Sequence, residues 1–200
     1  MVTSSFIPET RPPVEAVVVG ASAGGVQALL TLLTSLPDGY ALPIVAVLHL
    51  PASRDSQLAE IFRRRLSMRV HEAADKESIE PATLYFATSG YHLSIESDRS
   101  FSLSMEAPVN YSRPSIDVLM SSAADAYGPS LAGMVLTGAN IDGAAGLAKI
   151  RQRGGITVVQ DPSEALVPTM PEAAIRRLQP NHILTLAGIR DLLVTLGAQA

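Results

Sequence analysis

The feature that most constrains the fold is an apolar, valine-rich run that leads directly into a glycine-rich turn. Val14–Val19 is nearly continuous in apolar residues, which is typical of a strand buried on both faces of a parallel sheet. Gly20–Gly25 interrupts this pattern, and Val26–Leu36 then places apolar residues at helical spacing before Pro37. The chain therefore begins with a strand, a tight turn and a helix, which is the first part of a β-α-β unit.

The same alternation continues along most of the chain. Further strands are predicted at Ile44–Leu48, Met68–His71, Leu131–Leu136, Ile156–Val159 and His182–Leu186. Further helices are predicted at Ser56–Leu66, Ser115–Ala126, Gly143–Arg153, Pro171–Leu178 and Ala187–Leu196. This order predicts an α/β fold, a doubly wound three-layer α/β/α domain with a mostly parallel sheet and helices on both faces.

The middle of the chain has a different pattern. Thr83–Ala87, Tyr91–Glu96 and Phe101–Met105 are short alternating segments separated by turn residues rather than by helical patterns. Such spacing indicates a β-hairpin or a small meander. We therefore expect a β-hairpin insertion at about residues 83–105.

Composition excludes several kinds of function. The chain has 200 residues and no cysteine, so a covalent catalyst here would need a hydroxyl, carboxylate, amine or imidazole nucleophile. Its net charge of −4 does not favour nucleic-acid binding, and no apolar run is long enough to span a membrane. Residues 1–13 form a polar tail without the features of a secretory signal. We expect a cytoplasmic protein with one domain, residues 14–200.

Three polar side chains follow predicted strands, at the edge where doubly wound sheets bind their ligands. Ser22 lies in the first glycine-rich turn, His49 follows the second strand, and Asp142 follows the strand predicted at Leu131–Leu136. A hydroxyl, an imidazole and a carboxylate are therefore expected at one edge of the sheet.

The segment around Ser22 is open to three interpretations. Gly20-Ala21-Ser22-Ala23-Gly24 has the G-x-S-x-G form, in which a sharp turn between strand and helix exposes a nucleophilic serine. A turn that binds an anion or a nucleotide and a plain tight turn are the alternatives. The nucleotide interpretation is weakened because the glycine spacing is not G-x-G-x-x-G, no acidic residue ends the second strand, and no lysine follows the glycines.

The chain contains four histidines, and only His49 directly follows a buried strand beside the Ser22 turn. Structural roles are favoured for the other three, His71, His92 and His182. However, His92 could rim a site, and His182 could be the base of an alternative serine hydrolase. For Asp142, which precedes a predicted helix, capping of that helix is the simpler interpretation when the residue is considered alone.

Taken together, Ser22, His49 and Asp142 fit acyl transfer. A serine hydroxyl becomes a good nucleophile when an imidazole takes its proton, and a carboxylate fixes the tautomer of that imidazole. We expect Nε2 of His49 to face Ser22 and Nδ1 to face Asp142.

At this point the chain resembles a known family, the catalytic domain of the CheB-type chemotaxis protein-glutamate methylesterases. The matching segments occur in the same order from about Val14 onward: Val19-Gly20-Ala21-Ser22-Ala23-Gly24-Gly25, His49-Leu50-Pro51, Gly90-Tyr91-His92-Leu93, Arg113-Pro114-Ser115-Ile116-Asp117-Val118-Leu119, Leu136-Thr137-Gly138, Asp142-Gly143-Ala144-Ala145-Gly146 and Met170-Pro171-Glu172-Ala173-Ala174-Ile175. Several spaced motifs in one order are far more specific than any one of them.

The resemblance implies a serine hydrolase with Ser22 as nucleophile, His49 as general base and then acid, and Asp142 as the residue that orients His49. It implies glutamate γ-methyl esters as substrates, and often glutamine side chains, on the cytoplasmic helical bundles of chemoreceptors. It implies no metal and no organic cofactor. A catalytically weak receptor-binding adaptor of the same fold and a nucleotide-binding α/β domain are the alternative functions.

The chain also departs from the family pattern. Ala23 stands where threonine is common, and Ala139-Asn140 replaces a Met-Gly pair. If the oxyanion hole uses the backbone N–H groups of Ala23 and Ala139, the exchanged side chains are compatible with catalysis. The familiar form carries an N-terminal receiver domain, for which residues 1–13 leave no room. We therefore expect a stand-alone catalytic domain, for which a separate regulatory partner could replace the receiver. An excised or otherwise regulated version of the familiar form is the alternative.

Overall fold

The computed structural model of the chain describes residues 11–49 and 58–199. Its centre is a seven-stranded sheet in the order β3-β4-β2-β1-β7-β8-β9, in which every neighbouring pair is parallel. The strands are β1 (Ala16–Ala21), β2 (Ile44–Leu48), β3 (Arg69–Glu72), β4 (Thr83–Phe86), β7 (Leu131–Val135), β8 (Ile156–Gln160) and β9 (His182–Leu184). The predicted doubly wound α/β fold is confirmed.

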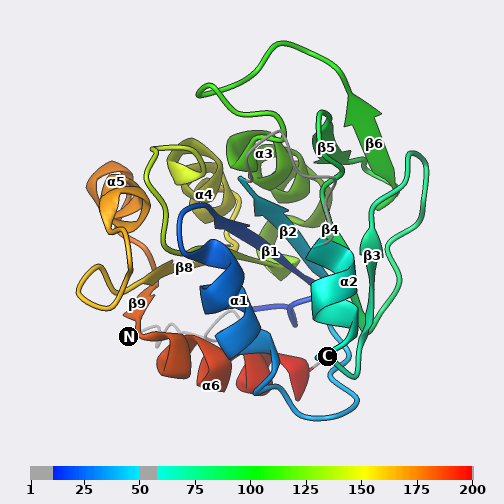
Figure 1. The fold of residues 1–200 in the computed structure, drawn as a ribbon, viewed down its shortest axis with the longest axis horizontal. Helices are drawn as coiled ribbons and strands as arrows, with labels where there is room; N and C mark the ends of the chain where they lie inside the picture. Colours follow the sequence, from blue (N-terminus) through cyan, green and yellow to red (C-terminus); the bar gives the residue numbers. More distant parts are fainter. Residues whose placement is uncertain (1–10, 50–57, 200) are drawn as a thin grey trace, which may run out of the picture.

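Helices cover both faces of this sheet (Figure 1). One face packs against α1 (Gly25–Leu33), α2 (Leu58–Arg63) and α6 (Leu186–Gly197). The other packs against α3 (Ile116–Tyr127), α4 (Ala144–Gln152) and α5 (Thr169–Arg177), and a 3₁₀ turn, η1 (Gly128–Ser130), joins α3 to β7. β1, β2, β4, β7 and β8 are buried along their whole length, and their residues are mostly apolar, as is typical of strands covered on both faces.

The predicted insertion at residues 83–105 is smaller than expected. Thr83–Phe86 forms β4, a central strand with parallel partners on both sides. Only β5 (His92–Ile95) and β6 (Phe101–Ser104) form the antiparallel hairpin. The alternating pattern was misleading here because β4 is short and all four of its residues are buried. Two residues of the helix predicted at Ser56–Leu66, and residues 1–10 of the predicted tail, lie outside the described residues.

The order of the strands places a topological switch at β1. The chain leaves β1 through α1 to reach β2 on one side, while β7 lies on the other side. The carboxyl ends of β1, β2 and β7 therefore meet at one edge, where such sheets bind ligands. The N-terminus of α3 packs against β1 at this place, so closely that a Cβ on Gly20 would lie 2.2 Å from Cγ2 of Ile116. Within the described residues, no helix is both long enough and apolar enough to cross a membrane.

Candidate active site

Ser22 and His49 are neighbours at the carboxyl ends of β1 and β2. The register pairs Ala21 with Leu48, and the N–H of His49 donates to the carbonyl of Ala21 at 3.1 Å. The residue after each strand therefore faces the other across the pair. Gly24 has a φ of 80° and precedes the first turn of α1, so the chain turns sharply just after Ser22. Ser22 is partly exposed, and its hydroxyl makes no hydrogen bond with His49 in this structure.

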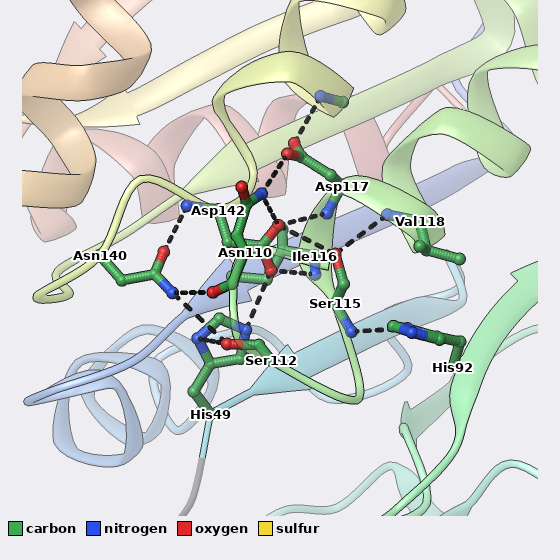
Figure 2. A network of polar contacts seen from close by, with 11 residues as sticks. His49, His92, Asn110, Ser112, Ser115, Ile116, Asp117, Val118, Asn140 and Asp142 are labelled. Carbon is green, nitrogen blue, oxygen red and sulfur yellow. Dashed lines mark hydrogen bonds and ion pairs between the residues drawn. The ribbon is translucent and has the colours of Figure 1, made fainter. Parts of the chain in front are cut away.

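His49 is held by Asp142, which lies seven residues after β7. Nε2 of His49 is 3.0 Å from Oδ2 of Asp142, and the two side chains are 12% and 0% exposed. The expected pairing of the two residues is present, but the imidazole is reversed from the expected orientation. Nδ1, not Nε2, is the ring nitrogen left for Ser22. The reason is that Asp142 is held at the N-terminus of α3, where its carboxylate accepts from the N–H of Ile116. Nε2 is the ring nitrogen that faces this carboxylate (Figure 2).

Asp142 accepts hydrogen bonds from five donors in three parts of the chain. Besides His49, they are Ile116 N at 2.6 Å, Asp117 N at 3.1 Å, Ser115 Oγ at 2.9 Å and Asn110 Nδ2 at 3.1 Å. Burial by itself would raise the pKa of this carboxyl group. The hydrogen bonds from His49, Asn110 and the α3 backbone outweigh burial and lower the pKa of Asp142 to about 2. Asp142 is thus ionised at neutral pH, as a partner of a histidine base must be.

The expectation that Asp142 alone would cap the helix that follows it is wrong, because its carboxylate serves a different helix. Asp142 precedes α4, yet its carboxylate binds the N-terminal N–H groups of α3. The N-terminus of α4 is served by Asp117, whose Oδ1 accepts from Gly146 N at 2.7 Å. Burial raises the pKa of Asp117, and the nearby charge of Asp142 acts in the same direction. The Asn110 amide donates to both carboxylates, at 2.9 Å to Asp117 and 3.1 Å to Asp142.

Two further polar residues, Ser112 and Asn140, complete the surroundings of His49. Ser112 Oγ lies 3.5 Å from Nδ1 of His49, and Asn140 Nδ2 lies 3.4 Å from Ser112 Oγ. The Asn140 amide also donates to the carbonyl of Asn110 at 3.3 Å and accepts from the N–H of Asp142. Figure 2 shows these contacts around the imidazole. The only sequence signal for this region was the adjacent Arg113-Pro114-Ser115 motif, which gave no role to Asn110 or Ser112.

The two expected oxyanion residues lie on either side of Ser22. Ala23 follows Ser22 in the turn, and Ala139 follows Gly138, where a Cβ would approach Cβ of Ser22 to 3.0 Å. Both alanines are exposed, and within residues 11–49 and 58–199 neither backbone N–H donates to another backbone group. Thr137 connects the turn after β1 with the segment after β7, because its hydroxyl donates to the carbonyl of Ala23 at 2.9 Å. Two unengaged N–H groups therefore border the serine.

The other three histidines are His92, His71 and His182. His92 and His71 are engaged by other groups, and His182 is exposed. His92 is buried, where Nε2 donates to the carbonyl of Ala107 at 3.1 Å and Nδ1 accepts from Ser115 N at 3.2 Å. It therefore supports the loop that leads into α3. His71, on β3, has its Nε2 2.7 Å from Oε1 of Glu77. His182 is exposed at the start of β9.

Comparison with known proteins places the chain in a family. The family model described as CheB methylesterase matches residues 17–193. A protein of Leptospira interrogans, by name a protein-glutamate methylesterase/protein-glutamine glutaminase, is 44% identical over 182 residues, which cover 91% of this chain and 94% of the relative.

Two other similar proteins extend the comparison. Protein-glutamate methylesterase FrzG of Myxococcus xanthus is 34% identical and aligns with 89% of this chain, which spans about half (53%) of that relative. The crystal structure of the Thermotoga maritima CheB methylesterase catalytic domain superposes with a TM-score of 0.87 at 29% identity, covering 92% of this chain and all of that domain.

Proposed function

Because the chain belongs to the CheB methylesterase family, we propose that it is a serine hydrolase that cleaves γ-methyl esters of glutamate side chains on chemoreceptors. The observation that carries this proposal is the hydrogen bond from Nε2 of His49 to the buried, ionised Asp142, with Ser22 at the adjoining strand end. A hydroxyl, an imidazole and a carboxylate in this relation are the requirements for acyl transfer.

The proposal gives a direction to each proton transfer. Asp142 is ionised, so Nε2 of His49 carries a hydrogen and donates it to the carboxylate. Nδ1 then has a free lone pair, and it takes the proton of Ser22 as the serine oxygen attacks the ester carbonyl. The protonated imidazole returns this proton to the leaving methoxide, and methanol departs. Water, activated in turn by Nδ1, hydrolyses the acyl-enzyme and releases the glutamate.

The negative oxygen of the tetrahedral intermediate needs donors that are free before the reaction begins. The N–H groups of Ala23 and Ala139 meet this requirement, because they border Ser22 without backbone partners among the described residues. Because both act through the backbone, alanine is compatible with the role at each position. The same acyl-enzyme would form from a glutamine side chain with ammonia as the leaving group, so the proposal includes deamidation.

The substrate lies on the cytoplasmic helical bundle of a methyl-accepting chemoreceptor, which places the enzyme in the cytoplasm. A catalytically weak adaptor of the same fold would bind the same bundle, but it would not need an ionised carboxylate oriented on the histidine beside a serine. The geometry of His49 and Asp142 therefore favours the enzyme.

The test is release of methanol from the methylated cytoplasmic fragment of a receptor, and of ammonia from the unmodified fragment. Wild type is expected to release methanol, and Ser22→Ala is expected to lose at least a thousandfold in kcat, as triad variants do. Ser35→Ala, an exposed serine beyond the end of α1, is the matched control and should behave as wild type. Binding of the fragment without release of either product would instead identify an adaptor.

A further inference from the structure

The polar side chains around His49 form a closed ring of hydrogen bonds. Asn140 Nδ2 donates to Ser112 Oγ at 3.4 Å, and Ser112 Oγ lies 3.5 Å from Nδ1 of His49. Nε2 of His49 is 3.0 Å from Asp142, and the N–H of Asp142 donates back to Oδ1 of Asn140. Figure 2 shows this ring, in which Ser112 is the group closest to the free nitrogen of the base.

Chemistry determines the direction of every bond in this ring. The backbone N–H of Asp142 can only donate, so the Asn140 atom facing it is the amide oxygen and the atom facing Ser112 is the NH₂ group. The Ser112 oxygen therefore accepts from Asn140 and has its own hydrogen left to donate. In the neutral imidazole, Nε2 carries the hydrogen that points to Asp142, and Nδ1 is an acceptor. The Ser112 hydroxyl thus donates to Nδ1 of His49.

This bond occupies the lone pair that the proposed reaction needs. Nδ1 has one lone pair in the plane of the ring, and only Nδ1 is available to Ser22 because Nε2 is engaged by Asp142. Ser22 itself makes no hydrogen bond with His49 in this structure. The two serine hydroxyls therefore compete for one acceptor, and in the free protein Ser112 occupies it.

We propose that Ser112, oriented by Asn140, is a positioning residue that holds the base nitrogen of His49 in the resting site and must release it before Ser22 can react. The inference rests on the proposed function, because it assumes that His49 activates Ser22. It also gives a role to Asn140, whose amide oxygen accepts from the N–H of Asp142 and whose NH₂ group donates to the Ser112 hydroxyl.

The hydrogen bond from Ser112 to His49 is long, so its loss should change the reaction rate only modestly. The change should be an increase, whereas loss of a catalytic group lowers the rate. We expect Ser112→Ala to accelerate the reaction of Ser22 about two- to fivefold, the range for removing one weak competing hydrogen bond. The experiment measures the second-order rate of labelling of the full chain by an alkyl fluorophosphonate, followed by intact-protein mass spectrometry. In this reaction the Ser22 oxygen bonds to phosphorus, fluoride leaves, and Nδ1 of His49 takes the proton.

Further variants separate positioning from general loosening of the site. Ser112→Thr keeps the hydroxyl and should label at the wild-type rate, and Ser112→Gly should repeat the acceleration if Ser112→Ala folds poorly. Ser121→Ala, a partly buried serine on α3 away from the ring, is the matched control. Asn140→Gly should accelerate labelling in the wild-type background, and this acceleration should disappear in the Ser112→Ala background. Any effect of its lost contacts with Asn110 and Asp142 would be the same in both backgrounds.

The outcomes distinguish this inference from the proposed function. Labelling of Ser22 at an equal or lower rate in Ser112→Ala than in wild type would overturn the inference alone. Equal acceleration by Asn140→Gly in both backgrounds would overturn the coupling between the two residues. If neither wild type nor Ser112→Ala were labelled at Ser22, the proposed function would fall, and this inference with it.

Discussion

At the scale of single residues, the site is organised around one carboxylate. Asp142 receives the imidazole of His49 on the same oxygen that receives the N–H of Ile116, while its other oxygen receives Ser115, Asn110 and Asp117. Both oxygens must therefore be acceptors. Only an ionised carboxylate provides this, which makes the position sensitive to the smallest change of side chain.

We expect Asp142→Asn to reduce kcat for methanol release about a thousandfold or more. The amide has one oxygen, so its NH₂ group would face either His49 and Ile116 or the donors on the other side, and the tautomer of His49 would no longer be set. Asp125→Asn, which removes an exposed ion-pair partner of Lys149, is the matched control. A kcat of Asp142→Asn within tenfold of wild type would contradict the assigned role.

The low pKa of Asp142 predicts how stability depends on acid. Its pKa is about 2 in the folded protein and 3.8 for the unperturbed group, so the unfolded chain takes up the proton first as the pH falls. The contribution of Asp142 is complete above about pH 4 and is lost between about pH 4 and pH 2. It amounts to roughly 2 kcal/mol in the free energy of unfolding.

Urea unfolding of wild type and Asp142→Asn at pH 2.5 and pH 6 measures this contribution. The difference in unfolding free energy between the two proteins should shrink toward the lower pH. Comparison with the variant is necessary because Asp117, whose pKa is raised by burial, changes stability with pH in the opposite direction. The same pH dependence in both proteins would show that Asp142 does not hold its charge in this way.

At the scale of elements, the site depends on how closely α3 approaches β1. The two meet at Gly20 and Ile116, and the N-terminal N–H groups of α3 bind Asp142. A side chain at Gly20 would push the helix from the strand that carries Ser22. The glycine is therefore required for space rather than for a special backbone conformation.

We expect Gly20→Ala to lower both stability and activity. Its Cβ would lie 2.2 Å from Cγ2 of Ile116, so strand and helix must separate, at a cost of about 1–3 kcal/mol in the free energy of unfolding. Because the same displacement moves Ile116 away from Asp142, methanol release should fall more than tenfold. Gly188→Ala in α6 is the control, since its nearest neighbour, Cβ of Leu184, would be 3.3 Å away. Urea unfolding and the methanol assay together check both effects.

The elements themselves could largely be predicted from sequence, because buried parallel strands and amphipathic helices have distinct patterns. Ile44–Leu48 was predicted with its observed bounds, and Ser115 was correctly placed at the start of α3. The pattern of Thr83–Ala87 predicts part of the hairpin, but a four-residue buried strand has too few positions to show which partners it takes. Pairing across a sheet depends on distant residues that a local pattern does not contain.

The same limit applies to the site. Ser22, His49 and Asp142 could be found because each directly follows or lies near the end of an apolar strand. Asn110 and Ser112 lie in an irregular segment between β6 and α3, which has no periodicity to place it over the imidazole. The orientation of His49 was predicted wrongly for a related reason, because it depends on where α3 holds Asp142 rather than on the spacing of the residues.

At the scale of the whole molecule, the position of each histidine in the sheet determines which one can serve Ser22. All seven strands are parallel, so position along one strand can be compared with position along the others. His49 directly follows β2, the strand next to β1. His182 pairs with Val158, which is level with Met134 and therefore with Val19. It lies three strands from β1, about 14 Å sideways, and about 10 Å short of the level of Ser22 along the strand direction.

This separation predicts opposite results for two substitutions that are chemically identical. His49→Ala should lower kcat for methanol release about a thousandfold or more, because it removes the imidazole proposed to take the Ser22 proton. His182→Ala should stay within about twofold of wild type, since its side chain is exposed on an edge strand and a surface substitution changes stability little. Both variants are assayed with the methylated receptor fragment, and both are checked by urea unfolding. A large loss in His182→Ala together with a small loss in His49→Ala would require a different base and would place the catalytic edge of the sheet elsewhere.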